Sequence, residues 1–262
     1  MQEIKYRWAP SLGDGFEGTP ESVWGIKKYK DINEDVVFCG LYGMKDFMAL
    51  NSHKGKKYIW WCGSDIRHFV NGYWLDETGK IRIDPKPLAK WINEYCYSWV
   101  ENKKEADVLK KIGIKAQICP SFLGDVNKFK PQKINPKKRY YSSVSGNDFK
   151  LYGWDKINKI ARKNPNTGYY LYGNTVRWKA PKNVIVRGRV PQKQMNEETK
   201  SMTGAIRMVE MEGCSEIIVK SVLWGQKPIS LIEYPFLKSK NPREELLKEV
   251  NRYPWNLTKN YE

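Results

Sequence analysis

The chain alternates between short apolar runs and longer segments in which apolar residues recur at helical spacing. In the first half, the apolar runs predict buried strands at residues 3–8, 35–39, 57–62, 95–100 and 115–119. Helices are predicted between them at residues 42–52 and 101–112, the second ending before Gly113. Strands that alternate with helices indicate a parallel sheet covered by helices on both faces.

This alternation is interrupted once and then resumes. Residues 120–138 are poor in apolar residues and rich in proline and lysine, which is typical of a linker. Beyond them, strands are predicted at residues 139–145, 168–173, 183–187, 205–210 and 227–233, and helices at 153–163, 191–202 and 215–224. Residues 242–253 have the spacing of an amphipathic closing helix. We therefore predict an α/β protein with a domain at 1–125, a linker at 126–138, a second domain at 139–240 and a closing helix and tail at 241–262.

The amino-acid composition indicates what kind of partner the protein binds. The 262 residues include 46 Lys+Arg and 29 Asp+Glu, a formal net charge of +17. Such an excess favours an anionic partner, such as a nucleic acid, an acidic membrane or a phosphorylated ligand. The other interpretation is a surface of solvated lysines without a binding role.

The cysteines and the apolar runs bear on location. The five cysteines are widely spaced without a CxxC pair, so we interpret them as buried thiols in a reducing compartment. No run approaches the ~20 apolar residues of a membrane-spanning helix, and MQEIKYRW lacks a signal-peptide core. We expect a cytoplasmic protein.

The segment GDGFEG, residues 13–18, has the spacing GxGxxG, with Thr19 and Pro20 able to begin a helix. As a dinucleotide site it is weak, because Asp14 and Glu17 would repel a pyrophosphate. Two interpretations remain beside it: a loop lining an active cleft, with Gly13, Asp14 and Gly15, or a plain turn.

The segment YIWWCGSDIRHF, residues 58–69, ends an apolar strand in Gly-Ser-Asp. This places Asp65 at the carboxyl edge of a parallel sheet, where open α/β sheets bind ligands. Asp65 is a candidate general base, and Arg67 and His68 could hold an anionic group. The alternative is an aspartate that caps a helix, with solvated neighbours. His53 lies in a lysine-rich stretch and is expected to be exposed.

The second half carries a resemblance. In EGCSEIIVKSVLWGQKPIS, residues 212–230, the positions that match a common frame are Glu212, Gly213, Ser215, Ser221, Gly225, Pro228 and Ile229. This frame resembles that of the nucleotide-sugar-dependent glycosyltransferases of the GT-B fold (group 1, family 4-like). The stretch NVIVRGRVP, with Arg189 and Val190, is similar to the base-binding loop of that family. The resemblance implies two Rossmann-like domains facing across a cleft, an acceptor-side N-terminal domain and a C-terminal domain that holds the donor.

The chain departs from the family at two positions. The family has a second acid eight positions after the first, usually assigned to the ribose hydroxyls, and this chain has Lys220 there. Lys220 could reach a donor phosphate or a sugar carboxylate, or its ammonium group could extend to solvent from a helix that is otherwise buried. The family's pyrophosphate-binding arginine is also missing, since Gly146 is followed by Asn147, and Lys150 is the phosphate candidate.

A smaller resemblance concerns the acceptor. IWWCGSDIRHF resembles the segment of phage DNA glucosyltransferases in which the aspartate is the catalytic base, here Asp65. Together with the charge of +17 and eleven tryptophans, it favours a DNA base, since a cationic cleft binds phosphates and aromatic rings replace lost stacking.

The sequence thus predicts a metal-independent glycosyltransferase without a cofactor, with a nucleotide-sugar as co-substrate and a hydroxymethylated pyrimidine in DNA as acceptor. The lack of an Asp-x-Asp triplet disfavours the metal-dependent single-domain glycosyltransferases. A glycolipid or polysaccharide acceptor stays open, with peripheral contact to an anionic membrane. So do a non-catalytic nucleic-acid-binding protein on a degenerate transferase scaffold and, less favoured, a nicotinamide-dependent oxidoreductase.

Overall fold

The computed structural model describes residues 4–16, 19–73, 82–144, 149–173 and 180–250. The chain divides into two units. The first comprises Met1–Gly124, Met211–Gly213 and Lys248–Glu262, and the second comprises Asp125–Glu210 and Cys214–Leu247. The predicted boundary at residue 125 lies next to this division, but the predicted linker belongs to the second unit and residues 211–213 belong to the first.

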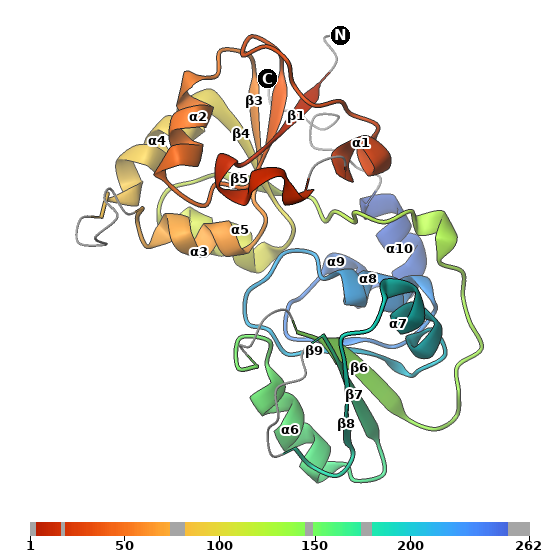
Figure 1. Cartoon of the computed structure of the whole chain (residues 1–262). Helices are drawn as coiled ribbons and strands as arrows, with labels where there is room; N and C mark the ends of the chain where they lie inside the picture. Colours follow the sequence, from red (N-terminus) through yellow and green to blue (C-terminus); the bar gives the residue numbers. More distant parts are fainter. Residues whose placement is uncertain (1–3, 17–18, 74–81, 145–148, 174–179, 251–262) are drawn as a thin grey trace. The chain divides into compact units, whose positions relative to one another are not determined.

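The first unit contains a parallel sheet in the order β1-β2-β3-β4-β5 (Figure 1). Its strands are β1 (Lys5–Trp8), β2 (Val36–Cys39), β3 (Lys57–Trp60), β4 (Cys96–Val100) and β5 (Ala116–Ile118). All five agree with the strands expected from the apolar runs. β2, with the sequence VVFC, is buried at every position because helices or other chain segments cover both faces of the sheet.

The chain reverses direction across the sheet at β1. Tyr6 forms a parallel bridge with Lys28, and its N–H donates to the carbonyl of Lys27 at 2.9 Å. Residues 27–29 therefore lie on one side of β1, whereas the chain continues to β2 on the other side. In open α/β sheets such a reversal marks the place where ligands bind, at the carboxyl ends of the two strands.

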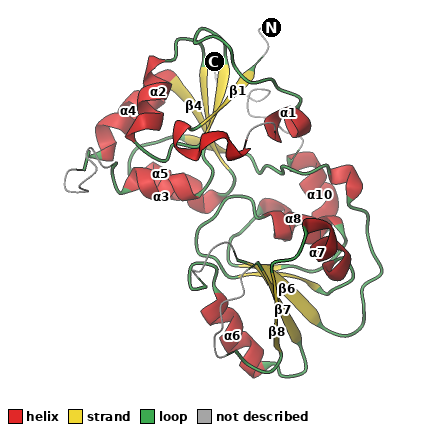
Figure 2. Ribbon diagram, viewed as in Figure 1, coloured by secondary structure: helices red, strands yellow, loops and turns green. Residues whose placement is uncertain are grey.

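Helical segments cover both faces of this sheet (Figure 2). They are η1 (Pro10–Phe16), α1 (Thr19–Trp24), α2 (Met44–Ser52), α3 (Ser64–Val70), α4 (Pro85–Tyr95) and α5 (Lys103–Lys111). Helix α1 begins at the predicted Thr19-Pro20 start, and α2 and α5 agree with the predicted helices. The apolar spacing did not predict α3 and α4.

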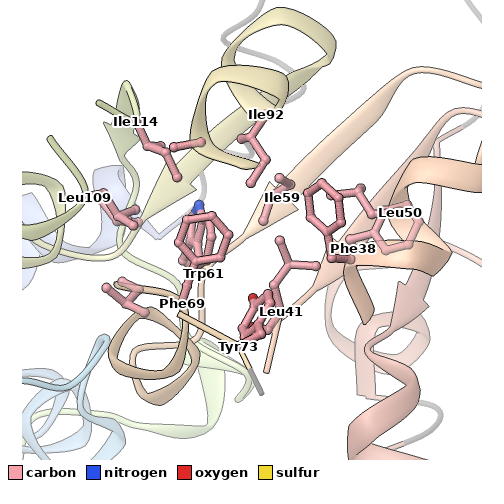
Figure 3. Packing of buried hydrophobic residues seen from close by; sticks show 14 of the residues in the cluster. Phe38, Leu41, Leu50, Ile59, Trp61, Phe69, Tyr73, Ile92, Leu109 and Ile114 are labelled. Atoms are coloured by element: carbon pink, nitrogen blue, oxygen red, sulfur yellow. The ribbon is translucent and has the colours of Figure 1, made fainter. Parts of the chain in front are cut away.

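Alternate strand residues form two apolar cores. In Figure 3, Phe38 and Ile59 from the strands pack with residues of α2 to α5, including Leu50, Ile92 and Leu109. On the opposite face, the core combines strand residues with the segment around α1: Tyr6, Val37, Cys39, Tyr58, Trp60, Trp99, Ile26 and the partly buried Trp24. Aromatic residues contribute to this core: Trp24 and Trp60 pack edge to face, with their ring centroids 4.8 Å apart.

The second unit repeats the architecture with the order β10-β9-β6-β7-β8, all parallel. Its strands are β6 (Arg139–Ser143), β7 (Gly168–Tyr172), β8 (Val184–Gly188), β9 (Gly204–Arg207) and β10 (Ile229–Ser230). Its helices are η2 (Val126–Lys128), α6 (Trp154–Lys163), α7 (Gln192–Thr199), α8 (Glu216–Leu223), α9 (Pro235–Lys238) and α10 (Pro242–Glu249), the last two residues of which belong to the first unit. The strand order reverses between β6 and β9, which makes their carboxyl ends the ligand-binding edge of this unit. The last residues of the predicted closing helix, beyond 250, lie outside the described residues.

The segment predicted as a linker packs on the second unit. The N–H of Gln132 donates to the carbonyl of Trp224, and the N–H of Asn135 donates to that of Ser201, both at 2.9 Å. Phe129 is buried, with its ring 5.6 Å from that of Trp224. The segment rich in proline and lysine therefore lies next to the boundary between the units, but it packs on the second unit and is not a flexible linker.

Among the described residues, no helix is both long enough and apolar enough to cross a membrane. All five cysteines lie within the described ranges, and their side chains are thiols rather than disulfides.

Candidate functional site

The first two loops at the carboxyl edge of the first unit are joined by a buried carboxylate. Asp46 of α2 accepts the N–H of Ser11, at 2.8 Å, from the loop after β1. Its other oxygen accepts the N–H groups of Tyr42 and Gly43, at 2.8 and 3.0 Å, from the loop after β2. The sequence analysis missed Asp46, although an acid three residues after Gly43 has capping-box spacing.

The glycine motif lies beside this junction. Gly13 is exposed with φ 63°, a conformation that favours glycine, and Asp14 and Gly15 fall within η1. A dinucleotide site requires a tight turn that opens directly into a helix. The described part of the motif lies in a 3₁₀ segment that is interrupted at Gly13, and the last two residues of the motif lie outside the described residues. The dinucleotide interpretation stays a less favoured prediction. The role of Gly13, Asp14 and Gly15 in a cleft loop stays a prediction.

Asp65 joins the second and third loops in the same way. It lies in the first turn of α3 and is fully buried. Its carboxylate accepts the N–H groups of Leu41, Cys62 and Ile66 at 3.0, 3.0 and 2.9 Å. Burial raises the pKa of Asp65 to about 7, and the backbone donors oppose this rise.

The position of Asp65 at the sheet edge agrees with the sequence analysis. The helix-capping alternative is wrong in its detail, since Gly63 is the N-cap of α3 and Asp65 also binds the backbone of Leu41 in another loop. Its role as the catalytic base stays a prediction. Arg67 is half-buried, and His68 is exposed with its ring 6.3 Å from that of Tyr42. Their role toward an anionic group stays a prediction. His53 was expected to be exposed and is buried, with Nε2 2.7 Å from the carbonyl oxygen of Glu34, so that expectation was wrong.

Two further buried acids lie at the end of β4. The N–H of Glu101 donates to Glu105 Oε2 at 3.0 Å, and the N–H of Glu105 donates to Asn102 Oδ1 at 3.1 Å. Ser121 Oγ donates to the carboxylate of Glu101. The sequence analysis did not identify these acids, because the segment ENKKE has the composition of a solvent-exposed first turn of a helix.

Glu212 and Gly213, predicted to bind the donor, pack against these acids. The side chain of Asn102 donates from Nδ2 to the carbonyl oxygen of Glu212 at 2.8 Å. A Cβ at Gly213 would collide with Glu101 Oε2, and a Cβ at Gly63 would lie 2.7 Å from the nitrogen of Gly213. The structure thus places both residues with the first unit, whereas the predicted domain boundaries put them in the second. Their donor roles stay predictions.

The other predicted donor residues lie in the second unit. Lys150 is exposed in the turn after β6, and Arg189 is exposed and Val190 half-buried after β8. Ser215 precedes α8 in the connection after β9, and its N–H donates to the hydroxyl of Tyr234 at 3.1 Å. Because the strands are parallel, all of these connections leave the same edge of the sheet. Their contacts to a donor stay predictions.

Lys220 does not extend into solvent. It is only 5 % exposed, its ammonium group forms an ion pair with Glu216 one helical turn earlier, and it lies 5.6 Å from the ring centroid of Phe129. The alternative of an ammonium group reaching solvent is therefore wrong. A contact to a donor phosphate stays a prediction.

Arg207 is a residue that sequence reasoning missed. It ends β9, is 8 % exposed, and donates from Nη1 to the carbonyl oxygen of Ser143 at the end of β6. Its guanidinium lies 4.7 Å from the ring centroid of Tyr152. Arg207 therefore spans the two strand ends where the order of the sheet reverses. The signal in the sequence was a single cation inside the buried run GAIRMV.

No protein-family model and no curated protein sequence matches the chain. Solved structures do match it. A complex of S. aureus TarM with fondaparinux, alpha-GlcNAc-glycerol and UDP is 13% identical, with a TM-score of 0.56 over 88% of this chain and 54% of that one. Sucrose-phosphate synthase from Thermosynechococcus elongatus is 11% identical, with a TM-score of 0.54 over 85% and 60%. This chain thus spans little more than half the length of either.

The DNA-modifying enzyme beta-glucosyltransferase also matches, with 13% identity over 95% of this chain and 87% of that one. Its TM-score is 0.48. The first two likenesses show the fold: the chain has the α/β architecture of the GT-B glycosyltransferases.

Proposed function

From the GT-B fold, we propose that the protein is a glycosyltransferase that moves a sugar from a nucleotide-sugar donor to a hydroxyl acceptor. The observation that carries the proposal is the strand reversal of the second unit. There Arg207 bridges the ends of β9 and β6, and Lys150 and Arg189 lie in connections at the same edge. Guanidinium and ammonium groups at such an edge suit a diphosphate.

In this proposal the cations neutralise the charge that develops on the leaving diphosphate, so the reaction requires neither a metal nor a bound cofactor. Glu212 accepts hydrogen bonds from the hydroxyl groups of the donor sugar. Asp65 takes the proton of the acceptor hydroxyl, a role that suits its pKa of about 7. Because Asp65 is enclosed, the loops after β2 and β3 must separate for that contact.

For the acceptor, we propose a hydroxymethylated pyrimidine in DNA. The net charge of +17 supports a polyanionic substrate. The five thiols support a reducing compartment, such as the cytoplasm, as the place of the reaction. A glycan is the alternative acceptor, since the TarM structure is a complex with alpha-GlcNAc-glycerol and UDP.

The test is nucleotide release from UDP-, GDP- and ADP-sugars, each with hydroxymethylated duplex DNA, unmodified DNA or a neutral glycan. We expect release from one donor with hydroxymethylated DNA only. Nucleotide release with the glycan but not with DNA would show that the acceptor is a glycan rather than DNA. Binding of DNA without release from any donor would indicate a non-catalytic protein on a transferase scaffold, for which the ion pair of Lys220 with Glu216 is the structural argument.

Equilibrium binding of the nucleotide-sugar identified in that assay tests the phosphate-binding edge. Lys150→Met should raise the dissociation constant of the donor, whereas Lys159→Met, which removes an exposed lysine from α6, should not. Equal donor affinities for the two variants would remove Lys150 from the donor site.

A further inference from the structure

Glu105, in the first turn of α5, is a fully buried carboxyl group that no step of the proposed reaction uses. Its Oε2 accepts the N–H of Glu101. Within the part of the chain that the structure describes, Oε1 has no hydrogen-bond partner and is inaccessible to solvent. An ionised carboxylate buried with one oxygen unsatisfied is costly, whereas a neutral carboxyl group is much less so.

Among the described residues, the groups that act most strongly on the charge of Glu105 are acidic. They are Glu101 at the end of β4, Asp65 of α3 and Glu212 of the segment Met211–Gly213, and the thiol of Cys62 lies in the same group. On α5 itself, Lys103 is exposed and forms an ion pair with Asp107 at 2.6 Å. Burial, followed by the charge of Glu101, raises the pKa of Glu105 well above its usual range.

The segment Met211–Gly213 is fitted closely to this group. A Cβ at Gly63 would lie 3.1 Å from Glu105 Oε1 and 2.7 Å from the nitrogen of Gly213. A Cβ at Gly213 would collide with Glu101 Oε2. Asn102 fixes the carbonyl of Glu212 from the same side. The two glycines thus bring the segment against the acids, where a further negative charge would act on it directly.

We propose that Glu105 keeps its carboxyl proton at neutral pH and that the absence of a charge on it allows Met211–Gly213 to stay packed against Glu101 and Asn102, which positions Glu212. Glu105 is then a positioning residue. When Glu105 loses the proton, its charge repels Glu101 and Glu212 and the segment leaves the sheet edge. The link to donor binding rests on the proposed function. The link between proton and segment does not.

The direct test is hydrogen exchange of the backbone amides in peptides that cover residues 208–216, corrected for intrinsic rates, between pH 6 and 10. Protection of the wild-type segment should fall about tenfold as Glu105 ionises. In Glu105→Gln, which keeps an oxygen for the N–H of Glu101 but cannot ionise, protection should not change with pH. The matched control is Asp107→Asn, which changes an exposed acid of the same helix and should follow the wild type.

A second variant isolates the hydrogen bond to the segment. Asn102→Ser keeps a hydroxyl group that can cap α5 but cannot reach the carbonyl of Glu212, so protection should be lower at every pH. If Glu105→Gln does not fold, titration of the wild-type side chain by ¹³C NMR of labelled glutamate carboxyls decides the protonation state. A carboxyl resonance of Glu105 that is already ionised at pH 7 would overturn the proposal.

The functional arm measures donor affinity and kcat against pH for the wild type and Glu105→Gln. Donor affinity should decrease on the alkaline side in the wild type only. If neither protein binds any nucleotide-sugar, the proposed function fails while the exchange result still decides the role of Glu105. The inference would be overturned, whatever the donor result, if amide exchange in the wild-type segment did not depend on pH. It would also be overturned if exchange in Glu105→Gln depended on pH as in the wild type.

Discussion

Asp65 shows how a single buried carboxyl group can be read in two ways. Its three backbone hydrogen bonds join the loops after β2 and β3 and the start of α3, which is a structural role. Its pKa of about 7 is the value that a general base requires. The two roles predict different results for one substitution.

Asp65→Asn should lower the melting temperature, because an amide NH₂ replaces one oxygen and meets a backbone N–H, leaving buried donors unsatisfied at a cost of ~1 to 3 kcal/mol. Thermal unfolding at several pH values measures this. The folded carboxyl group holds a proton that the unfolded chain releases near pH ~4, so the stability of the wild type relative to the variant should fall as pH rises from there to about 7, and then level off.

Turnover by the folded fraction of Asp65→Asn tests the catalytic role. A general base implies a loss of ~10²-fold or more with donor affinity nearly unchanged. If the folded variant turns over normally, Asp65 is structural only.

At the scale of elements, Lys220 connects α8 to the chain segment that leads into β6. Its ammonium group lies near the ring of Phe129, which itself packs against Trp224 at the end of α8. The backbone bond from Gln132 to Trp224 fastens the same segment. Lys220, a cation in the middle of an apolar helix, therefore contacts the segment around Phe129 and helps to fix it against α8.

Lys220→Met keeps the apolar stem and removes the charge. We expect the free energy of unfolding to change by less than ~1 kcal/mol, because the partner Glu216 is mostly exposed and loss of the cation–π contact is offset by removal of a buried charge. A loss of ~1 to 3 kcal/mol in donor affinity would support the phosphate contact, since that is the value of a charge-assisted hydrogen bond. Donor affinity equal to that of the wild type would remove Lys220 from the donor site.

At the scale of the whole molecule, the positive charge carries the acceptor proposal. If DNA is the acceptor, its binding should weaken steeply with salt, because each phosphate neutralised by lysine or arginine releases counterions and adds ~0.9 to the slope of log affinity against log salt on duplex. Binding isotherms from low to moderate salt measure the slope. A slope near zero, or equal binding to a neutral glycan, would exclude nucleic acid as the acceptor.

The elements could be read from the sequence because their causes are local. The run of four apolar residues in β2 is short and bounded by polar residues and glycine, which favours a buried strand, and Asn102 with Gly113 marks both ends of α5. The break in composition near residue 125 likewise lies at the division between the units. The sequence analysis predicted neither α3 nor α4. Helix α3 was missed because it has few apolar positions and because its start coincides with a candidate site motif.

The partners of the buried polar groups were decided by the tertiary structure alone. Asp65 bonds to Leu41, which lies 24 positions away, and Asn102 bonds to Glu212, which lies 110 positions away. Leu41 and Asp65 come together because β2 and β3 are neighbours in the sheet, and no local periodicity encodes that pairing. The bond between Asn102 and Glu212 depends on where the segment Met211–Gly213 packs, which no local pattern encodes either. The sequence by itself therefore determined two α/β units and the positions of acids and cations after their strands, whereas only the sheet topology decided which of them are enclosed, paired or aligned along one edge.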